Sequence, residues 1–403
     1  MPSIVHTERV FVSLWGHRVG MIVPAPRAGL YAFRYDPSFI ESGVEIAPLG
    51  MPLRRAPYAF PDLPSDAFSG LPPVFADSLP DSFGTGLVDL WLSGRGLSRA
   101  EITPLDRLAY VGRRGMGALC YEPDRGQRGQ PSSLELRALV ESARRAANGE
   151  LSTLPGDDAI SAIIRLGSSA GGAQAKAVVG WNRETGQFVF GDGDLPDGFE
   201  HWIVKFTPKE YPWRGERELA MNHAAAVAGV AVPESLLVEA DGLRHFMTRR
   251  FDRDGVQRHH LLTFSALAHI APDAPAEARS YEALFVATDR LSLPWEDREE
   301  LFRRMAFNIL ADEYDDHAKN VSFILRQGGA WRLAPAYDLT GSRFPSADPW
   351  NAHTGVHRLS VCGKFAGIGD DDLLRIADRF GIGTAKDILA RVRAAVADNL
   401  PKP

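Results

Sequence analysis

The sequence has few cysteines, no long apolar run and no large excess of charge of one sign. Only two of the 403 residues are cysteine, Cys120 and Cys362, so a disulfide framework is excluded and a reducing compartment is expected. No stretch approaches the roughly 20 apolar residues that a membrane-spanning helix needs. The N-terminal segment lacks the continuous apolar run of a signal peptide. A net charge of −6 argues against direct binding to nucleic acid. We therefore expect a cytoplasmic protein without direct membrane or DNA contact.

The length and composition are typical of a globular chain with two or three packed units. Alternating apolar residues at 10–14 and 18–23, with a turn at Gly16-His17, predict a β-hairpin. Residues 29–35 alternate in the same way and predict a third strand. Further along this part of the chain we expect loops over 48–80 and helices over 85–93 and 98–110.

The order of patterns changes after a polar segment rich in Gly and Pro at 122–132, which predicts a connection between units. An amphipathic helix follows, with Leu136, Leu139 and Val140 on its apolar face. Beyond residue 155 the expected order is strand, glycine-rich loop, strands, helix and strands, and beyond residue 263 the patterns are mostly helical. A small β-rich lobe followed by a helical lobe predicts a two-lobed unit.

Asp315 and Asn320 are the first candidates for chemistry. An apolar helical pattern at 301–309 precedes them and a predicted strand at 321–325 follows. An Asp five positions before an Asn is the spacing of a kinase catalytic loop, in which the Asp orients the attacking hydroxyl and the Asn binds magnesium. The usual His-Arg before that Asp is absent, and Glu313-Tyr314 stand in its place. Judged from these residues alone, the alternative to a catalytic loop is a polar turn in which an Asp and an Asn have this spacing by chance.

A second carboxylate, Asp338, follows a predicted hairpin. Strands at 321–325 and 331–334 flank a Gln-Gly-Gly turn, and this hairpin would bring Asp338 back near the loop. Kinases hold their second magnesium ligand at this place. Asn320 and Asp338, with nucleotide phosphates and water, make a reasonable magnesium site because that ion rarely uses an all-protein cage.

Lys205 lies alone within an apolar strand pattern at 201–206. A buried ammonium group needs a partner, and Glu218 at the start of the next predicted helix is a candidate. A strand lysine paired with a helix glutamate is the kinase arrangement for contacting nucleotide phosphates. The alternative is that Lys205 is a charge on an edge strand and that Glu218 is an unrelated acid in the first turn of a helix, where the helix dipole favours it.

A glycine-rich segment at 167–176 lies between an apolar run at 159–164 and a predicted strand at 177–179. Glycines let backbone N–H groups approach phosphates. The segment is neither a Walker loop nor a G-x-G-x-x-G before a helix, so a flexible hairpin is the alternative. Glycine loop, strand Lys, helix Glu, Asp-x4-Asn and hairpin Asp nevertheless occur in the order that a kinase requires.

Together these motifs resemble the HipA-type serine/threonine kinases, which are the toxins of bacterial toxin–antitoxin pairs. The resemblance covers nearly the whole chain. The strings that carry it are Ser169–Lys176, Phe307–Leu310, Asp315–Asn320 and Leu333–Asp338, with lesser matches at Gly20, Phe33–Asp36, Asp77–Asp81, Arg250–Arg253 and Leu359–Lys364.

The resemblance implies an α+β fold with a protein kinase-like, phosphoinositide kinase-like catalytic unit. The implied domains are a β-rich N-terminal domain at 1–125, a linker and helix at 126–155, and a catalytic domain at 156–403, divided into a small lobe at 156–258 and a helical lobe at 259–403.

The resemblance also implies roles for particular residues in an enzyme that uses ATP and Mg²⁺. Asp315 would be the catalytic base, and Asn320 and Asp338 the magnesium ligands. Lys205 would contact phosphates with Glu218 as its partner. The other implied nucleotide contacts are Phe246 and Met247 at the adenine hinge, Ser168, Ser169, Ala170, Gly171, Gly172, Ala173 and Gln174 in the glycine loop, and His317 and Lys319.

Partners and regulation are implied in the same way. Family members phosphorylate proteins, notably aminoacyl-tRNA synthetases, and a small helix-turn-helix antitoxin restrains them, so DNA contact is expected only through that partner.

Ser169 aligns with a serine that members autophosphorylate, and a phosphate there would compete with those of the nucleotide for the same N–H groups. Ser168 is adjacent, and Ala175 departs from the acidic residue common before the loop lysine. A small-molecule or lipid kinase, or a pseudokinase acting as a binding module, are the alternatives.

Overall fold

The computed structural model describes residues 5–126, 132–133, 136–147, 174–190, 195–341 and 355–400, in two compact units. The predicted strand at 159–164 and the glycine loop from 167 to 173 lie outside these residues. The first unit consists of the ranges Met1–Ile46, Met51–Pro212 and Leu236–His260. The second consists of Ala47–Gly50, Trp213–Ser235 and Leu261–Pro403.

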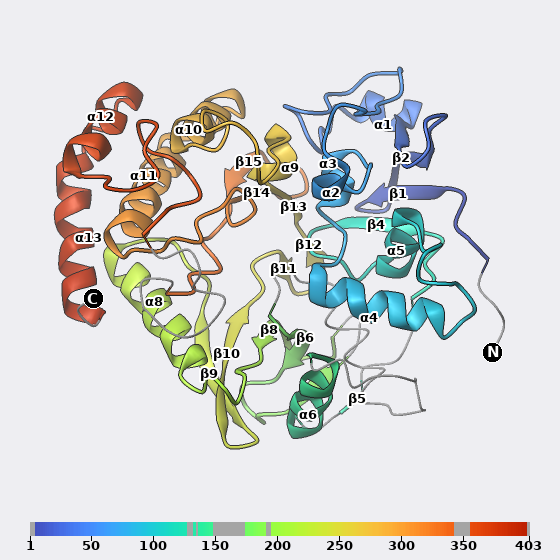
Figure 1. The fold of residues 1–403 in the computed structure, drawn as a ribbon, viewed down its shortest axis with the longest axis horizontal. Helices are drawn as coiled ribbons and strands as arrows, with labels where there is room; N and C mark the ends of the chain where they lie inside the picture. The colour runs from blue at the N-terminus through green and yellow to red at the C-terminus, as the bar shows by residue number, and fades with distance from the viewer. Residues whose placement is uncertain are drawn as a thin grey trace. The chain divides into compact units, whose positions relative to one another are not determined.

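A four-stranded antiparallel sheet of order β3-β2-β1-β4 begins the first unit, and Figure 1 labels β1, β2 and β4 of it. The predicted hairpin and third strand are confirmed, but the turn is Trp15-Gly16, one residue earlier than expected, with φ of +50° and +83°. Positive φ at both turn residues matches the right-handed twist of the two strands. Gly20 is required because a Cβ there would lie 2.2 Å from the carbonyl oxygen of Arg34. The strands are β1 (Val10–Leu14), β2 (His17–Pro24), β3 (Tyr31–Tyr35) and β4 (Leu119–Glu122).

Short helices connect the strands of this sheet. The expected helix at 98–110 begins only at Pro104, because Thr103 and Asp106 form a capping box: each side chain accepts a hydrogen bond from the backbone N–H of the other. Two one-turn helices also lie in the segment that was expected to be loops. The helices are α1 (Pro37–Ser42), α2 (Ser65–Phe68), α3 (Pro73–Ala76), α4 (Ser82–Ser93) and α5 (Pro104–Val111).

A six-stranded sheet of order β5-β7-β6-β8-β10-β9 completes the first unit. One hydrophobic core joins it to the N-terminal helices, because Val88 of α4 and Tyr110 of α5 belong to the same buried cluster as Trp202 and Met247 of the sheet. The strands are β5 (Ser132–Ser133), β6 (Lys176–Trp181), β7 (Phe188–Phe190), β8 (Glu200–Lys205), β9 (Ser235–Ala240) and β10 (Leu243–Arg249). The predicted amphipathic helix is α6 (Leu136–Ala147), and a small ribbon of β11 (Arg253–Asp254) and β12 (Gln257–Arg258) follows β10.

A buried ion cluster also joins the N-terminal part of the first unit to the residues after β10. Asp252 is fully buried and accepts two hydrogen bonds from Arg250 (2.9 and 2.8 Å), one from Arg253 (2.7 Å) and one from the N–H of Gly117 (2.7 Å). Burial alone would raise the pKa of Asp252, but the two guanidinium groups hold it well below its usual value. Arg253 and Arg258 also donate to the Gly117 carbonyl.

We expect the first unit to lose stability as the pH falls. Burial lowers the pKa of His260 to about 4, and burial together with Arg250 and Arg253 lowers that of His201 to about 3. A histidine of the unfolded chain titrates near 6.5, so between about pH 6.5 and 4 the unfolded state binds more protons and the free energy of unfolding falls. Below about pH 4 the stabilisation from the depressed pKa of Asp252 is lost as well.

Thermal unfolding at pH 7, 6 and 5 measures this dependence. A melting temperature that stays constant between pH 7 and 5 would contradict it, and the variant His260→Gln should show a shallower dependence than the natural chain.

The second unit is mostly helical, as predicted for the part beyond residue 263. Helices α8, α11 and α13 contact one another (Figure 1), and strands β13, β14 and β15 form a small sheet in that order. Helix α8 ends at Gly229 with φ of +88°, as expected for a glycine at a helix C-terminus. The elements are α8 (Arg214–Ala228), β13 (His260–Thr263), α9 (Phe264–Ala268), α10 (Tyr281–Arg290), α11 (Trp295–Leu310), β14 (Ser322–Leu325), β15 (Trp331–Leu333), α12 (Asp370–Phe380) and α13 (Ala385–Asn399).

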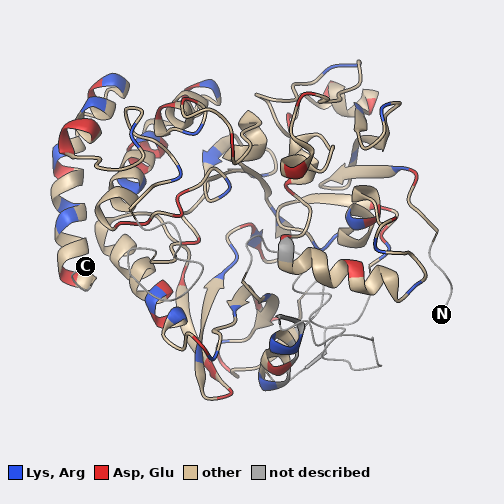
Figure 2. Ribbon diagram, viewed as in Figure 1, with Lys and Arg blue, Asp and Glu red and all other residues tan. Residues whose placement is uncertain are grey.

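Charges of both signs are interspersed along α12 and α13 (Figure 2). Ion pairs join Arg375 to Asp372 (2.5 Å) and Arg393 to Asp370. Acidic and basic side chains of these two helices therefore pair with one another. None of the helices in the described ranges combines the length and the apolar character needed to cross a membrane.

Candidate active site

Four acids lie in the loop after α11, and three of them, Glu313, Asp315 and Asp316, fall within four positions in environments that differ. Glu313 and Asp316 are buried, with 1% and 4% of their surface exposed, whereas the side chain of Asp315 is 40% exposed. A carboxylate that acts on a substrate hydroxyl must be accessible to it. Of these three, Asp315 is the one with a partly exposed side chain, as a candidate base requires.

The backbone of this loop turns tightly around Asp315. Its carbonyl oxygen accepts hydrogen bonds from the N–H of His317 (2.9 Å) and from Nδ2 of Asn320 (3.0 Å). Because only the amide nitrogen can donate to a carbonyl, the orientation of the Asn320 side chain is fixed and its Oδ1 points away from Asp315. An amide oxygen is the atom that would bind magnesium. His317 Nε2 lies 3.9 Å from Asp315 Oδ1, which is too long for a hydrogen bond.

Tyr337 connects this loop to the segment of Asp338. Its hydroxyl donates to the carbonyl oxygen of Lys319 (2.6 Å) and therefore accepts from the hydroxyl of Ser322 (2.6 Å). Tyr337 directly precedes Asp338, and Lys319 directly precedes Asn320. The two expected magnesium ligands thus follow two residues that are hydrogen-bonded to each other.

Glu313 makes a second connection between the same two segments. Its carboxylate accepts from the N–H of Gly341 (2.7 Å), the hydroxyl of Thr340 (3.2 Å) and, more weakly, the N–H of Asp315 (3.3 Å). The sequence pattern showed only that Glu313 departs from the usual His-Arg. In the structure this residue holds the loop to the residues that follow Asp338.

The segment after β15 has an unusual backbone at the expected ligand itself. Asp338 has φ of +60°, a left-handed conformation that costs a non-glycine residue about 1 kcal/mol or more. Gly341 is also left-handed, and a Cβ there would lie 2.7 Å from Arg217 of α8. Glu218 follows Arg217 on this helix and is buried. The helix that carries Glu218 therefore contacts the Asp338–Gly341 segment, while the pairing of Glu218 with Lys205 stays a prediction.

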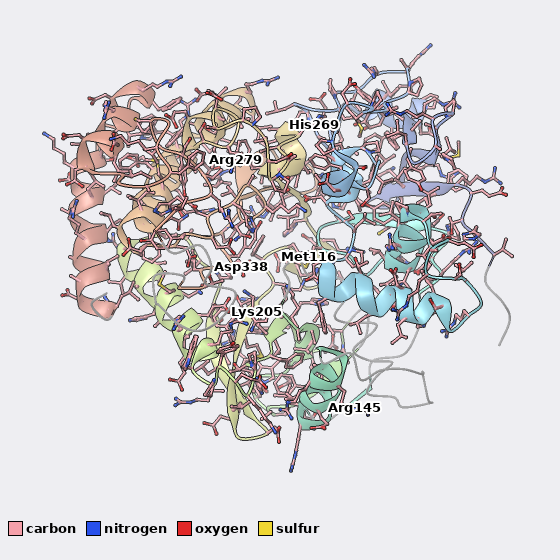
Figure 3. All side chains as sticks on the ribbon, viewed as in Figure 1. Met116, Arg145, Lys205, His269, Arg279 and Asp338 are labelled. Atoms are coloured by element: carbon pink, nitrogen blue, oxygen red, sulfur yellow. The ribbon has the colours of Figure 1, made fainter. Side chains whose placement is uncertain are left out.

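In the first unit, Lys205 is the last residue of β8. Figure 3 labels its side chain, and it also labels that of Asp338, which belongs to the second unit. Its register partners are Phe246 on β10 and Lys176 on β6, and Met247 is opposite Val204. The expected phosphate-contacting lysine and the expected hinge residues are thus on adjacent strands. Lys205 Nζ is 5.7 Å from the centre of the Phe246 ring.

The pairing of β6 with β8 also places Lys176 and Lys205 on the same face of the sheet, where like charges repel. Asp81, the N-cap residue of α4, forms a buried ion pair with Lys176 (3.2 Å) and offsets this repulsion. In the sequence, Asp81 ends the string Asp77–Asp81, and the resemblance implies no role for it.

The expected nucleotide loop is described only at its end. Gln174 Nε2 donates to the carbonyl of Phe206 (3.0 Å), and the N–H of Phe206 donates to the carbonyl of Ala175 (2.9 Å). This end of the loop is therefore fixed to the residue that follows β8. The remaining expected loop contacts, Ser168, Ser169, Ala170, Gly171, Gly172 and Ala173, lie outside the described residues.

The side chains of Asn320 and Asp338 offer oxygen atoms, the ligand type that Mg²⁺ takes. Among the side chains that the structure describes, no group of three or more His, Cys, Asp or Glu is arranged to hold a metal ion. Asn320 and Asp338 would supply two oxygen ligands and leave the other positions to phosphates and water, which is the usual pattern for Mg²⁺.

Comparisons with known proteins identify the family of the chain. The family model "HipA-like C-terminal domain" matches residues 168–400, and "HipA N-terminal domain" matches residues 10–122. Two curated relatives carry the name "Putative kinase". One, Y4dM of Sinorhizobium fredii, is 26% identical over 355 residues, covering 82% of this chain and 78% of the relative. The other, from Haemophilus influenzae, is 28% identical over 153 residues, covering 34% and 44%.

A solved structure is similar over almost the whole chain. It is HipA of Shewanella oneidensis MR-1, determined in a complex with HipB and its operator DNA. The TM-score is 0.64 at 18% identity, with 98% of this chain and 92% of that chain covered. This likeness shows the fold, and the kinase-like α+β class expected from the sequence is confirmed. With both family models matched in order along the sequence, the chain belongs to the HipA family.

Proposed function

We propose that this protein is an ATP- and magnesium-dependent serine/threonine protein kinase. The observation that carries the proposal is the exposed carboxylate of Asp315 on a loop that Tyr337 and Glu313 fix to the segment of Asp338. The names of its relatives, which designate kinases, support the same reaction class.

In the proposed reaction the protein mainly positions groups and neutralises charge. Asp315 orients the hydroxyl of the substrate protein and accepts its proton. Asn320 and Asp338 would hold the magnesium ion, which supplies positive charge beside the transferring phosphoryl group. Lys205 contacts the nucleotide phosphates, and Glu218 is its proposed partner.

The proposal extends to partners. HipA of Shewanella oneidensis was solved with HipB and operator DNA. By this likeness, and by the resemblance of the sequence motifs, we propose a small helix-turn-helix antitoxin as the partner, with DNA contacted through it. The proposed substrate is a cellular protein such as an aminoacyl-tRNA synthetase, and Ser169 is the proposed site of self-phosphorylation.

Nucleotide binding offers a direct test. By isothermal titration the natural chain should bind ATP in the presence of Mg²⁺, and Asn320→Ala should weaken that binding about tenfold because one metal-binding oxygen is lost. Asn399→Ala is the matched control, since the amide of Asn399 also donates to a backbone carbonyl, that of Ala395 (2.8 Å), at the end of α13.

Two results would count against the proposal. Equal MgATP affinity in Asn320→Ala and the natural chain would remove Asn320 from the metal site. Binding of MgATP by the natural chain without transfer of labelled phosphate to itself or to any added protein would favour a binding module over a kinase.

A further inference from the structure

Asp316 is the neighbour of the proposed base, yet its side chain points into the interior of the second unit. Its Oδ1 accepts the N–H of Arg358 (2.7 Å). Its Oδ2 accepts the hydroxyl of Tyr281 (2.9 Å) and lies 3.2 Å from Nδ1 of His357. A buried carboxylate with this many donors is held in one position, since each contact satisfies a group that burial would otherwise leave without water.

Tyr281 extends this anchor to two helices. It is the first residue of α10 and is almost completely buried. Its hydroxyl donates to Asp316 and accepts from Nδ2 of Asn308 on α11 (3.0 Å). Burial, with the charge of Asp316 beside it, raises the pKa of Tyr281 well above its ordinary value, so the hydroxyl keeps the proton that it donates. The loop is thereby attached to α10 and α11 through one side chain.

The anchor controls where Asp315 lies because the two residues share a peptide bond. With the side chain of Asp316 fixed inside the unit, the preceding residue has little freedom in the direction its own side chain takes. Glu313, two residues earlier, is the second buried anchor of the same loop. Asp315 is therefore a partly exposed residue between two buried, hydrogen-bonded ones.

We propose that Asp316 and Tyr281 are positioning residues for the phosphate-transfer reaction. The inference rests on the proposed kinase function, since it assigns Asp315 as the group that is positioned. Neither residue is assigned a contact with nucleotide or metal, so their loss should act on turnover and leave nucleotide affinity close to that of the natural chain. A displacement of about 1 Å in a reacting group can lower a rate about a hundredfold.

The variant Tyr281→Phe tests this with minimal disturbance, because it keeps the ring and deletes only the hydroxyl. We expect the kcat for phosphate transfer to fall about tenfold while the KM for ATP changes less than about threefold. Asp316→Asn should lower kcat further, by about a hundredfold, because an amide cannot serve all the donors that the carboxylate accepts.

Tyr35→Phe is the matched control. Tyr35 is buried to the same degree, and its hydroxyl donates to the carbonyl of Met51 (2.7 Å) in the first unit. This variant also loses the hydrogen bond of a buried tyrosine hydroxyl, here to a neutral carbonyl, and that bond has no connection to the loop. Its kcat and KM should equal those of the natural chain.

Hydrogen exchange gives a second measurement that does not depend on activity. The N–H groups of His317 and Asn320 are hydrogen-bonded within the loop, so a peptide covering residues 313–321 reports on its order. Exchange in this peptide should be about tenfold faster in Tyr281→Phe and unchanged in Tyr35→Phe.

The outcomes distinguish a failure of the proposed kinase function from a failure of the proposed positioning role. If the natural chain transfers no phosphate, the kinase proposal fails, and the exchange data still decide whether Tyr281 orders the loop. If the natural chain is active but Tyr281→Phe matches it in both kcat and exchange, the positioning role is wrong and the kinase proposal stands. Equal losses of kcat in Tyr281→Phe and Tyr35→Phe would reduce the role to general stability and overturn the inference.

Discussion

Replacing Asp315 with asparagine should lower phosphate transfer about a thousandfold and leave the fold intact. Asparagine has the same shape but cannot accept the proton of the substrate hydroxyl, and loss of a catalytic base costs about 10² to 10⁴ in rate. Because the Asp315 side chain is 40% exposed, removing its charge should have little effect on stability. Asp289→Asn is the control, since Asp289 is similarly exposed (43%) and lies on α10 of the same unit.

The measurement is transfer of labelled phosphate from ATP to the full chain and to added protein, with circular dichroism as the check on folding. Peptide mapping of the labelled chain shows whether Ser168 or Ser169 receives phosphate. Label on neither serine would refute self-phosphorylation of the glycine loop. Transfer by Asp315→Asn at the rate of the natural chain would show that another group acts as the base.

Replacing Asp252 with asparagine should lower the free energy of unfolding of the first unit by about 3–5 kcal/mol, the usual effect of breaking a buried ion pair. The substitution removes the carboxylate charge from between the guanidinium groups of Arg250 and Arg253, both of which are buried beside it. It also weakens the acceptor of the Gly117 N–H. Unlike the substitution of Asp315, this one should act on stability and not directly on chemistry.

Urea unfolding followed by tryptophan fluorescence measures this effect. The control is Asp370→Asn, which breaks the ion pair between Asp370 and Arg393. Both side chains of that pair are about half exposed. Exposed pairs contribute about 0–1 kcal/mol, so the control should change little. A loss below about 1 kcal/mol in Asp252→Asn would mean that the guanidinium groups find other partners when the carboxylate charge is gone.

Features that depend on near neighbours in sequence could be predicted. The first hairpin follows from alternating apolar residues and a short turn. The spacing of Asp315, Asn320 and Asp338 around a predicted strand pair makes them candidates, and their roles stay a prediction. The late start of α5 at Pro104 was missed, although the Thr103-x-x-Asp106 capping box was present in the sequence as a signal for it. The spacing of local motifs thus identified which residues are candidates.

Features that depend on distant contacts could not be predicted. The burial of Asp316 depends on Tyr281, 35 positions earlier, and that of Asp252 on Gly117, 135 positions away. In the sequence, Glu313, Asp315 and Asp316 are three similar acids within four positions. Only the tertiary structure makes two of them internal anchors and leaves the third exposed.

The ion cluster around Asp252 has a consequence for how such proteins can change by recombination. Gly117 lies within the stretch matched by the N-terminal family model, whereas Asp252 and Arg253 lie within the stretch matched by the C-terminal one. A recombination crossover between the two stretches would produce a protein in which the buried arginines and aspartate come from one parent gene. The loop of Gly117 that they contact would come from the other parent gene. A poor fit there would leave buried charges unsatisfied. Selection should therefore keep the two halves of the gene together as one inherited unit.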